Sequence, residues 1–173
     1  LADAWANVSR DLTGNAGAIA VLAPALNALG QMHRAGLVQD DLHLGNFLRS
    51  EGCLFVIDGD AVRAVSPGKA LDAEQRAGNL AILLAQLSPA WDRHQAELLA
   101  AYAGSEVDCR LPIEHLQREV WRVRDWRLKD YLGKTVRDCT LFSVNRTMTR
   151  FTACARQTAA ILAPLLADPD KVL

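Results

Sequence analysis

Three polar side chains between positions 41 and 58 have the types and the spacing that phosphoryl transfer requires. Such a reaction needs a carboxylate that orients the attacking hydroxyl, and oxygen ligands for the cation that neutralises charge on the phosphates. Asp41 and Asn46 are spaced as D-x-x-x-x-N, and Asp58 follows twelve residues later, where the apolar run Leu54–Ile57 ends. In this pattern Asp41 would accept the proton of the attacking hydroxyl, and Asn46 and Asp58 would bind the metal ion.

The spacing alone is weak evidence, because a chain of this length and ordinary composition has roughly a one in three chance of containing it. Its surroundings make it stronger. A helix ends at His33–Gly36, the loop Val38–Asn46 follows, and a hairpin then leads to Asp58. The alternative interpretation is that these residues only cap turns, which Asp, Asn and Gly favour.

The elements that must position this loop can be read from the hydrophobic periodicity. Residues 16–34 show helical spacing of apolar side chains and predict a buried helix that stops at Arg34–Gly36. Two β-prone runs around the turn Ser50–Gly52 predict one short hairpin. From Leu71 onward the pattern predicts helices near 72–88, 92–103, 113–142 and 144–166. The predicted fold class is α+β and mainly helical, in one domain over residues 1–173.

Composition excludes several classes of protein. The chain is 50% hydrophobic with a net charge of -1, which argues against disorder and gives no sign of nucleic-acid binding. Its four cysteines form no C-x-x-C, so we expect reduced thiols in a cytoplasmic setting and no zinc site. The apolar stretch Ala16–Leu29 is too short to span a bilayer.

Positive charge is concentrated in one part of the chain. Residues 1–109 hold 7 Lys/Arg against 13 Asp/Glu, whereas residues 110–156 hold 11 against 5. The basic region from Arg118 to Arg137 could face an acidic substrate, anionic lipid headgroups or only solvent. Trp121 and Trp126 could anchor it at a membrane, but we expect at least one of them to pack, because one face of this helix is apolar.

We expect the histidines outside the loop to be structural or surface residues and not part of the site. His33 ends an apolar helix stripe, so we expect a hydrogen-bonded core residue and not a ligand. We expect His94 and His115 on the surface, since they have no metal-ligand spacing to each other.

Two segments carry a family resemblance. The segment Gln39–Asn46, taken with Val56–Asp60, resembles the protein-kinase-like superfamily, most closely its bacterial lipopolysaccharide core kinases, which phosphorylate heptose or Kdo. Residues 131–140 look like the C-terminal region of that family. The resemblance implies an ATP-dependent kinase in which Asp41 is the catalytic base, Asn46 and Asp58 bind Mg²⁺, and Leu48 lies under adenine. The implied acceptor is a sugar hydroxyl of the lipopolysaccharide inner core. The implied location is the cytoplasm, with peripheral contact at the inner face of the inner membrane.

Several positions depart from the family pattern. Gln39 and Asp40 stand where protein kinases carry His and Arg, so control through an Arg-bound phosphate is not expected. His43 replaces their Lys, which suits a small-molecule kinase better. Gly59 replaces the Phe of D-F-G, so another contact would have to seat Asp58.

The upstream half of a kinase nucleotide site is not found in this sequence. Kinases hold the phosphates with a Gly-rich loop and a strand Lys ahead of the catalytic loop. The first Lys here is Lys69, and Thr13–Gly17 does not match G-x-G-x-x-G. Because the chain also opens at Leu1 and not at Met, we expect a C-terminal lobe that is inactive alone, without its N-terminal lobe.

Two other functions remain open. Asp41-Leu42-His43 followed by Gly45-Asn46 also resembles the loops of aminoglycoside- and choline-kinase-like phosphotransferases. A catalytically silent pseudokinase or interaction module would explain Gly59, Gln39 and the missing upstream Lys.

Overall fold

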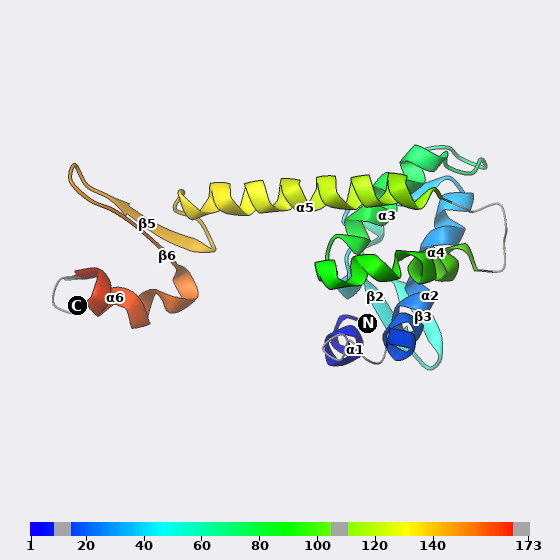
Figure 1. The fold of residues 1–173 in the computed structure, drawn as a ribbon, viewed down its shortest axis with the longest axis horizontal. Helices are drawn as coiled ribbons and strands as arrows, with labels where there is room; N and C mark the ends of the chain where they lie inside the picture. The colour runs from blue at the N-terminus through cyan, green and yellow to red at the C-terminus, as the bar shows by residue number, and fades with distance from the viewer. Residues whose placement is uncertain (9–14, 105–110, 168–173) are drawn as a thin grey trace. The chain divides into compact units, whose positions relative to one another are not determined.

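The computed structural model describes residues 1–8, 15–104 and 111–167. Contacts divide the chain into two compact units, unit 1 from Leu1 to Val123 and unit 2 from Arg124 to Leu173, which are described separately (Figure 1). Thr13, Gly14 and Cys109, which the sequence interpretation mentions, lie outside the described residues. Cys53, Cys139 and Cys154 are free thiols.

Helices make up most of unit 1. They are α1 (Ala2–Val8), α2 (Asn15–Arg34), α3 (Ala73–Leu84), α4 (Gln95–Ala103) and the first half of α5 (Ile113–Thr135), with short 3₁₀ turns at Leu44–Asn46, Gly59–Ala61 and Pro89–His94. The prediction of a helix over 16–34 is confirmed. Its stop is confirmed as well, since Gly36 adopts a positive φ of 78° that favours glycine.

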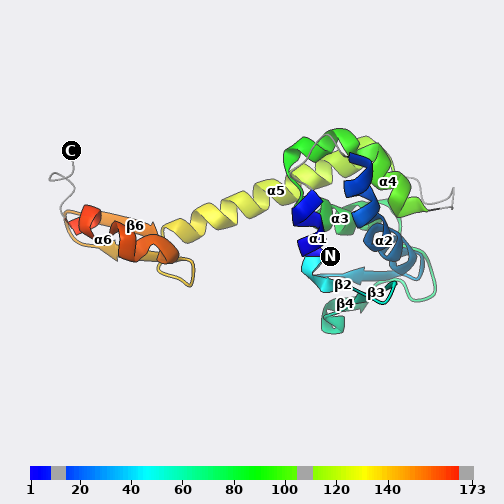
Figure 2. The same cartoon turned by 90° about the horizontal axis from the view of Figure 1, so that it is seen from below.

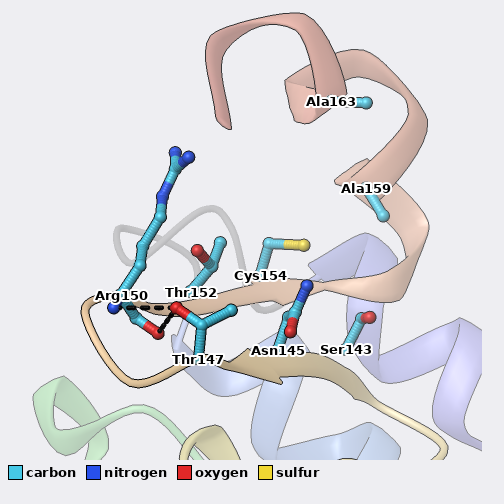
Figure 3. Close-up of a pocket in the computed structure, with 8 residues that line it drawn as sticks. All are labelled: Ser143, Asn145, Thr147, Arg150, Thr152, Cys154, Ala159 and Ala163. Carbon is cyan, nitrogen blue, oxygen red and sulfur yellow. Dashed lines mark hydrogen bonds between the residues drawn. The ribbon is translucent and has the colours of Figure 1, made fainter. Parts of the chain in front are cut away.

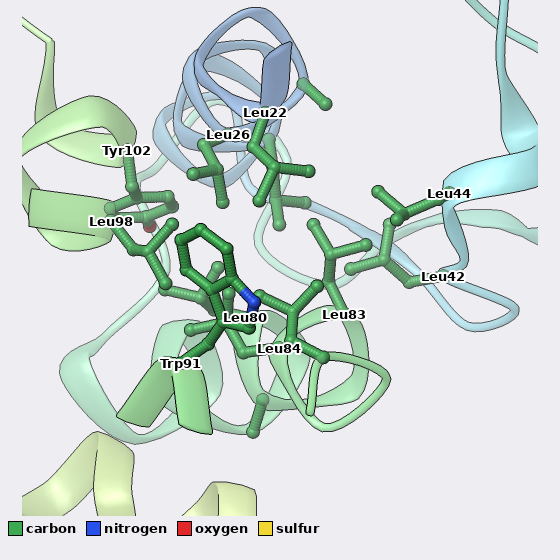
Figure 4. Close-up of a cluster of buried hydrophobic side chains, with 14 of the residues drawn as sticks. Leu22, Leu26, Leu42, Leu44, Leu80, Leu83, Leu84, Trp91, Leu98 and Tyr102 are labelled. Carbon is green, nitrogen blue, oxygen red and sulfur yellow. The ribbon is translucent and has the colours of Figure 1, made fainter. Parts of the chain in front are cut away.

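The core of unit 1 lies where α2, α3 and α4 meet. Figure 4 shows Leu22 and Leu26 facing Leu80, Trp91 and other buried side chains from the later helices. His33 is fully buried, as predicted. His94 is buried too, so its expected surface position is wrong; its ring packs 5.4 Å from that of Trp91.

Two antiparallel strand pairs complete unit 1. The predicted hairpin is confirmed as β2 (Phe47–Ser50) paired with β3 (Cys53–Val56). A second pair was not predicted: β1 (Leu37–Gln39) joins β4 (Val62–Ala64), with Gln39 opposite Val62. Figure 2 shows β2, β3 and β4 gathered on the side of unit 1 away from α4.

Unit 2 corrects the sequence interpretation of the C-terminal third. Helix α5 ends at Thr135, and residues predicted as helices 113–142 and 144–166 include a hairpin of β5 (Phe142–Arg146) and β6 (Phe151–Ala155), followed by α6 (Ala159–Ala167). The segment from Thr140 to Thr152 is rich in β-branched and aromatic residues, which fit a pleated surface better than a helix. The expectation of a single hairpin is therefore wrong.

The fold class itself is confirmed, since the described residues form six α-helices and three two-stranded antiparallel pairings. Leu116 and Val120 are buried on α5, as expected for its apolar face. Trp121 and Trp126 are each 64% exposed, so the expectation that one of them packs is wrong. Among the described helices, none combines the length and the apolar character needed to cross a lipid bilayer. That residues 1–173 form one kinase-like lobe stays a prediction.

Candidate active site

Backbone pairing brings the segments of Asp41 and Asp58 together. Strand β1 runs into the loop that carries Asp41, and β4 starts just after the turn that carries Asp58. Past the paired residues, the Asp40 N–H donates to the carbonyl of Ala61 at 2.9 Å. At the other end of the loop, the Ile57 N–H donates to the carbonyl of Asn46 at 2.9 Å. All three candidate residues therefore belong to one hydrogen-bonded frame.

Asn46 closes the loop on itself. Asn46 is only 6% exposed, and its Nδ2 donates to the carbonyl oxygen of Asp41 at 2.8 Å. This bond holds the backbone at Asp41 and leaves Oδ1, the atom that a metal would need, out of that contact. Asn46 is thus both a structural brace and a candidate ligand.

Asp41 presents its carboxylate to solvent, with 68% of the side chain exposed. His43 lies beside it, with Nε2 3.7 Å from Asp41 Oδ2. Gly45 makes room for this imidazole, because a Cβ at position 45 would lie 2.9 Å from His43 Cε1. An accessible carboxylate of this kind can accept a proton from a bound hydroxyl.

Asp58 has a left-handed backbone conformation, with φ 64° and ψ 56°. Asp tolerates this region better than most residues, and its side chain is exposed. Its carbonyl oxygen accepts a hydrogen bond from Gln39 Nε2 at 3.3 Å. Position 59 has open space around it, since a Cβ added to Gly59 would meet no atom within 4 Å. The Asp58 carbonyl also accepts from the Ala61 N–H at 3.2 Å, so Gln39 and the backbone of Ala61 together hold the Asp58 turn.

Gln39 is fully buried, and only part of its side chain is satisfied. Its Oε1 has no hydrogen-bond partner within the described part of the chain, although the atom is buried. Leaving such an oxygen unpaired costs about 1–3 kcal/mol. The side chain that joins the Asp41 loop to Asp58 is therefore held at a cost in stability.

A buried network under the loop fixes the position of β1. Asn79 on α3 donates from Nδ2 to the carbonyl of Gln39 at 2.9 Å, and its Oδ1 accepts from the Gln39 N–H at 3.3 Å. The same Oδ1 lies 3.0 Å from His33 Nε2, so this nitrogen carries the proton. His33 Nδ1 then accepts from the Tyr102 hydroxyl at 2.8 Å.

Burial lowers the pKa of His33 from 6.5 to about 4, against the opposing effect of its hydrogen bond to Asn79. The charge of Arg76 lowers the pKa of His33 further. His33 is therefore neutral near pH 7, as its two hydrogen bonds require. Its role is structural, in agreement with the sequence interpretation.

Asp40 faces away from this network and pairs with β4. Its two carboxylate oxygens accept from Arg63 Nε at 2.8 Å and Nη2 at 3.0 Å. This bidentate hydrogen bonding lowers the pKa of the exposed Asp40 carboxyl. Asp40 therefore reinforces the pairing of β1 with β4, and its carboxylate is occupied.

Leu48 belongs to an exposed apolar face of the β2–β3 hairpin. It lies opposite Phe55, and the two side chains are 51% and 50% exposed, with Ile57 at 44%. Phe47, on the other face, is buried in the core. Three apolar side chains on one small surface next to Asp58 could support a flat ring.

Sequence reasoning missed the residues that position the site. Asn79 and Gln86 lie on or just after α3, and Gln86 Nε2 donates to the carbonyl of Leu42 at 2.7 Å. The available signal was an Asn inside an apolar helix face, which must find a partner when buried. No group of three or more His, Cys, Asp or Glu side chains that could hold a metal occurs among residues 1–8, 15–104 and 111–167.

Comparisons with known proteins found no matching family model, no significantly similar curated protein and no significantly similar solved structure.

Proposed function

We propose that this chain carries the acceptor-binding and metal-binding half of an ATP-dependent phosphotransferase that acts on a hydroxyl group. The proposed acceptor is a sugar of the lipopolysaccharide inner core, in keeping with the resemblance of residues 39–46 and 56–60 to kinases of that class.

One observation carries the proposal. Hydrogen bonds connect the segments of Asp41, Asn46 and Asp58: Asn46 Nδ2 donates to the Asp41 carbonyl at 2.8 Å, and Gln39, two residues ahead of Asp41, donates to the Asp58 carbonyl at 3.3 Å. The two carboxylates nevertheless remain exposed. A carboxylate that capped a turn would accept a hydrogen bond from a nearby backbone N–H, whereas the side chains of Asp41 and Asp58 accept none from the described part of the chain.

The residues have oxygen donors that fit Mg²⁺. Nucleotide-bound Mg²⁺ uses one or two carboxylates together with phosphate oxygens and water, so Asp58 and Asn46 Oδ1 form a sufficient protein contribution. Bound Mg²⁺ would neutralise charge on the phosphates. Asp41 would orient the acceptor hydroxyl and take its proton as the new P–O bond forms.

The nucleotide half of the site would use Leu48, Phe55 and Ile57 as an apolar floor for adenine. The Gly-rich loop and the strand Lys are absent ahead of Asp41 in the sequence. We propose that polypeptide outside residues 1–173 supplies them. For this reason the catalytic tests below use the full-length gene product.

Two alternatives are separated by experiment. A panel of acceptors, with core heptose and Kdo compounds beside choline and an aminoglycoside, distinguishes the sugar kinase from the other small-molecule phosphotransferases. The silent pseudokinase is favoured by Gly59, which leaves the Asp58 turn without side-chain packing. Turnover on any member of the panel would exclude it.

Two substitutions test the assigned roles. Asp41→Asn keeps the side-chain shape but loses the charge that takes the proton, so turnover should fall by roughly 10²-fold or more while Mg-ATP affinity stays unchanged. Asp58→Asn removes a charged Mg²⁺ ligand, so it should abolish turnover and also make nucleotide binding less dependent on Mg²⁺. Turnover and Mg²⁺-dependent ATP binding would be measured for each.

Asp60→Asn is the matched control, since Asp60 is an exposed carboxylate two positions from Asp58 and has no assigned role. It should keep parental turnover. Parental turnover in both the Asp41 and the Asp58 variant would refute the mechanism. A large drop in melting temperature for both would show that these residues are turn caps.

A further inference from the structure

Unit 2 exposes an unusual share of apolar side chains. Ten of the fourteen exposed large hydrophobic residues in the described chain lie in Arg124–Ala167. The segment Arg124–Ala167 also contains eight Lys/Arg against three Asp, which gives it a net charge of +5. Each Asp already has a basic partner, namely Lys129, Lys134 or Arg156. Mixed apolar and basic surfaces of this kind suit anionic lipid headgroups.

The turn between β5 and β6 concentrates both properties. Met148 is fully exposed at this turn, at 105% of its reference area. Arg146, Arg150 and Phe151 flank it, and Phe151 is 52% exposed. A solvated Met at a tip has no packing role within the described chain, so its apolar surface is available to a partner.

Hydrogen bonds between Thr147 and Arg150 close the turn. The Thr147 N–H and the Thr147 hydroxyl both donate to the Arg150 carbonyl, at 2.8 and 3.2 Å. The Arg150 N–H in turn donates to Thr147 Oγ1 at 2.9 Å, and Figure 3 shows these two residues closing the turn. Because these bonds restrict the backbone of the turn, they reduce the conformational entropy that is lost when Met148 is buried.

The two faces of the hairpin differ. Figure 3 shows Ser143, Asn145 and Thr152 directed toward α6, where a hollow of about 420 Å³ separates the hairpin from Ala159. On the opposite face the last cross-strand pair is Arg146 with Phe151, whose ring centroid lies 5.2 Å from Arg146 Cζ. At the tip, Thr147 and Arg150 also line the hollow, whereas the Arg146 guanidinium lies over Phe151 and donates from Nη2 to the Val136 carbonyl at 2.6 Å.

We propose that this turn inserts Met148 and Phe151 into the headgroup region of an anionic phospholipid bilayer, to which the net positive charge of Arg124–Ala167 attracts it. A projecting tip of this shape and charge fits a fluid, negatively charged surface. The inference goes beyond the phosphotransfer proposal and does not depend on it. It also places membrane contact at the hairpin, whereas the sequence offered the basic region Arg118–Arg137 as a surface for an acidic substrate, anionic lipid headgroups or only solvent.

The test is co-sedimentation of residues 1–173 with vesicles of phosphatidylcholine alone or mixed with phosphatidylglycerol. The parent chain should bind the mixed vesicles and not phosphatidylcholine. Met148→Gln should lower the partition coefficient for the mixed vesicles by roughly tenfold, because the polar side chain loses the transfer free energy of the thioether. Met148→Leu keeps an apolar tip and should bind like the parent.

Trp121→Gln serves as the matched variant in unit 1, since Trp121 is 64% exposed but lies outside the hairpin. It should bind like the parent. Parental binding by Met148→Gln, or no binding of the parent to either vesicle, would overturn the proposal. A loss in Trp121→Gln alone would assign the contact to α5 instead. These readouts need no nucleotide, so they leave the phosphotransfer proposal untouched.

Discussion

Buried, neutral His33 should make unit 1 sensitive to mild acid. Burial lowers the folded-state pKa of His33 to about 4, whereas the unfolded chain has the ordinary value of 6.5. Below pH 6.5 the unfolded state therefore binds a proton at His33 that the folded state does not bind, and the free energy of unfolding falls. The stabilising contribution is fully present above the unfolded pKa and is lost as the pH drops toward the folded pKa.

The size of the effect follows from the two pKa values. Between about pH 7.5 and about pH 5, the His33 linkage should remove about 2 kcal/mol from the free energy of unfolding. This change would be measured by urea unfolding, followed by tryptophan fluorescence. Trp5 and Trp91 report on the core, since their ring centroids lie 4.8 Å apart and both side chains are buried.

His33→Gln provides the comparison, because glutamine can hydrogen-bond but does not titrate. The variant should lose about 2 kcal/mol less than the parent over the same pH interval, whatever its absolute stability. An equal loss in parent and variant would refute the assignment. If the variant does not fold, the ring-proton chemical shift of His33 in the parent gives its pKa directly, and an ordinary value near 6.5 would refute the same reasoning.

Two further substitutions test the frame of the candidate site, each by urea unfolding. Asn79→Ala leaves two backbone groups and a ring N–H buried without partners, so it should lower the free energy of unfolding by about 3 kcal/mol or more. Gln31→Ala removes one exposed hydrogen bond and should lower the free energy of unfolding by under about 0.5 kcal/mol. Similar losses in the two variants would show that the network does not hold β1. Gly36→Ala should lower the free energy of unfolding by several kcal/mol, because its Cβ would lie 1.8 Å from the Ser66 carbonyl oxygen. Gly52→Ala has open space around it and should lose only about 1–2 kcal/mol because of its positive φ. Equal losses in the two variants would contradict the close approach at Gly36.

Local patterns in the sequence were sufficient for the first half of unit 1. The helix over 15–34, its stop at Gly36 and the β2–β3 hairpin depend on short-range periodicity and turn residues, and all three were predicted. The β5–β6 hairpin was missed although the β-branched and aromatic residues of 140–152 favour a strand, because the prediction extended the helical pattern of the preceding residues through this segment. Burial of His94 depends on Trp91, whose position sequence spacing does not reveal.

In the candidate site, too, local features could be predicted from the sequence and long-range contacts could not. Asp41, Asn46 and Asp58 could be selected from sequence because motif spacing is local. The bonds that brace them are not local: Asn79 is 40 residues from Gln39, and Gln39 is 19 residues from Asp58. A motif names the groups that would do chemistry, whereas tertiary pairing decides which other side chains hold them.

The unpaired oxygen of Gln39 has a consequence for how this chain would change under selection. A buried polar atom without a partner is an unfavourable feature that an apolar or better-matched residue would relieve. The amide nitrogen of the same side chain, however, braces the Asp58 turn. Selection for heat resistance alone would therefore favour replacement of Gln39, while selection for a seated Asp58 would retain it. The residue found at position 39 after laboratory evolution would thus record which of these two pressures had acted.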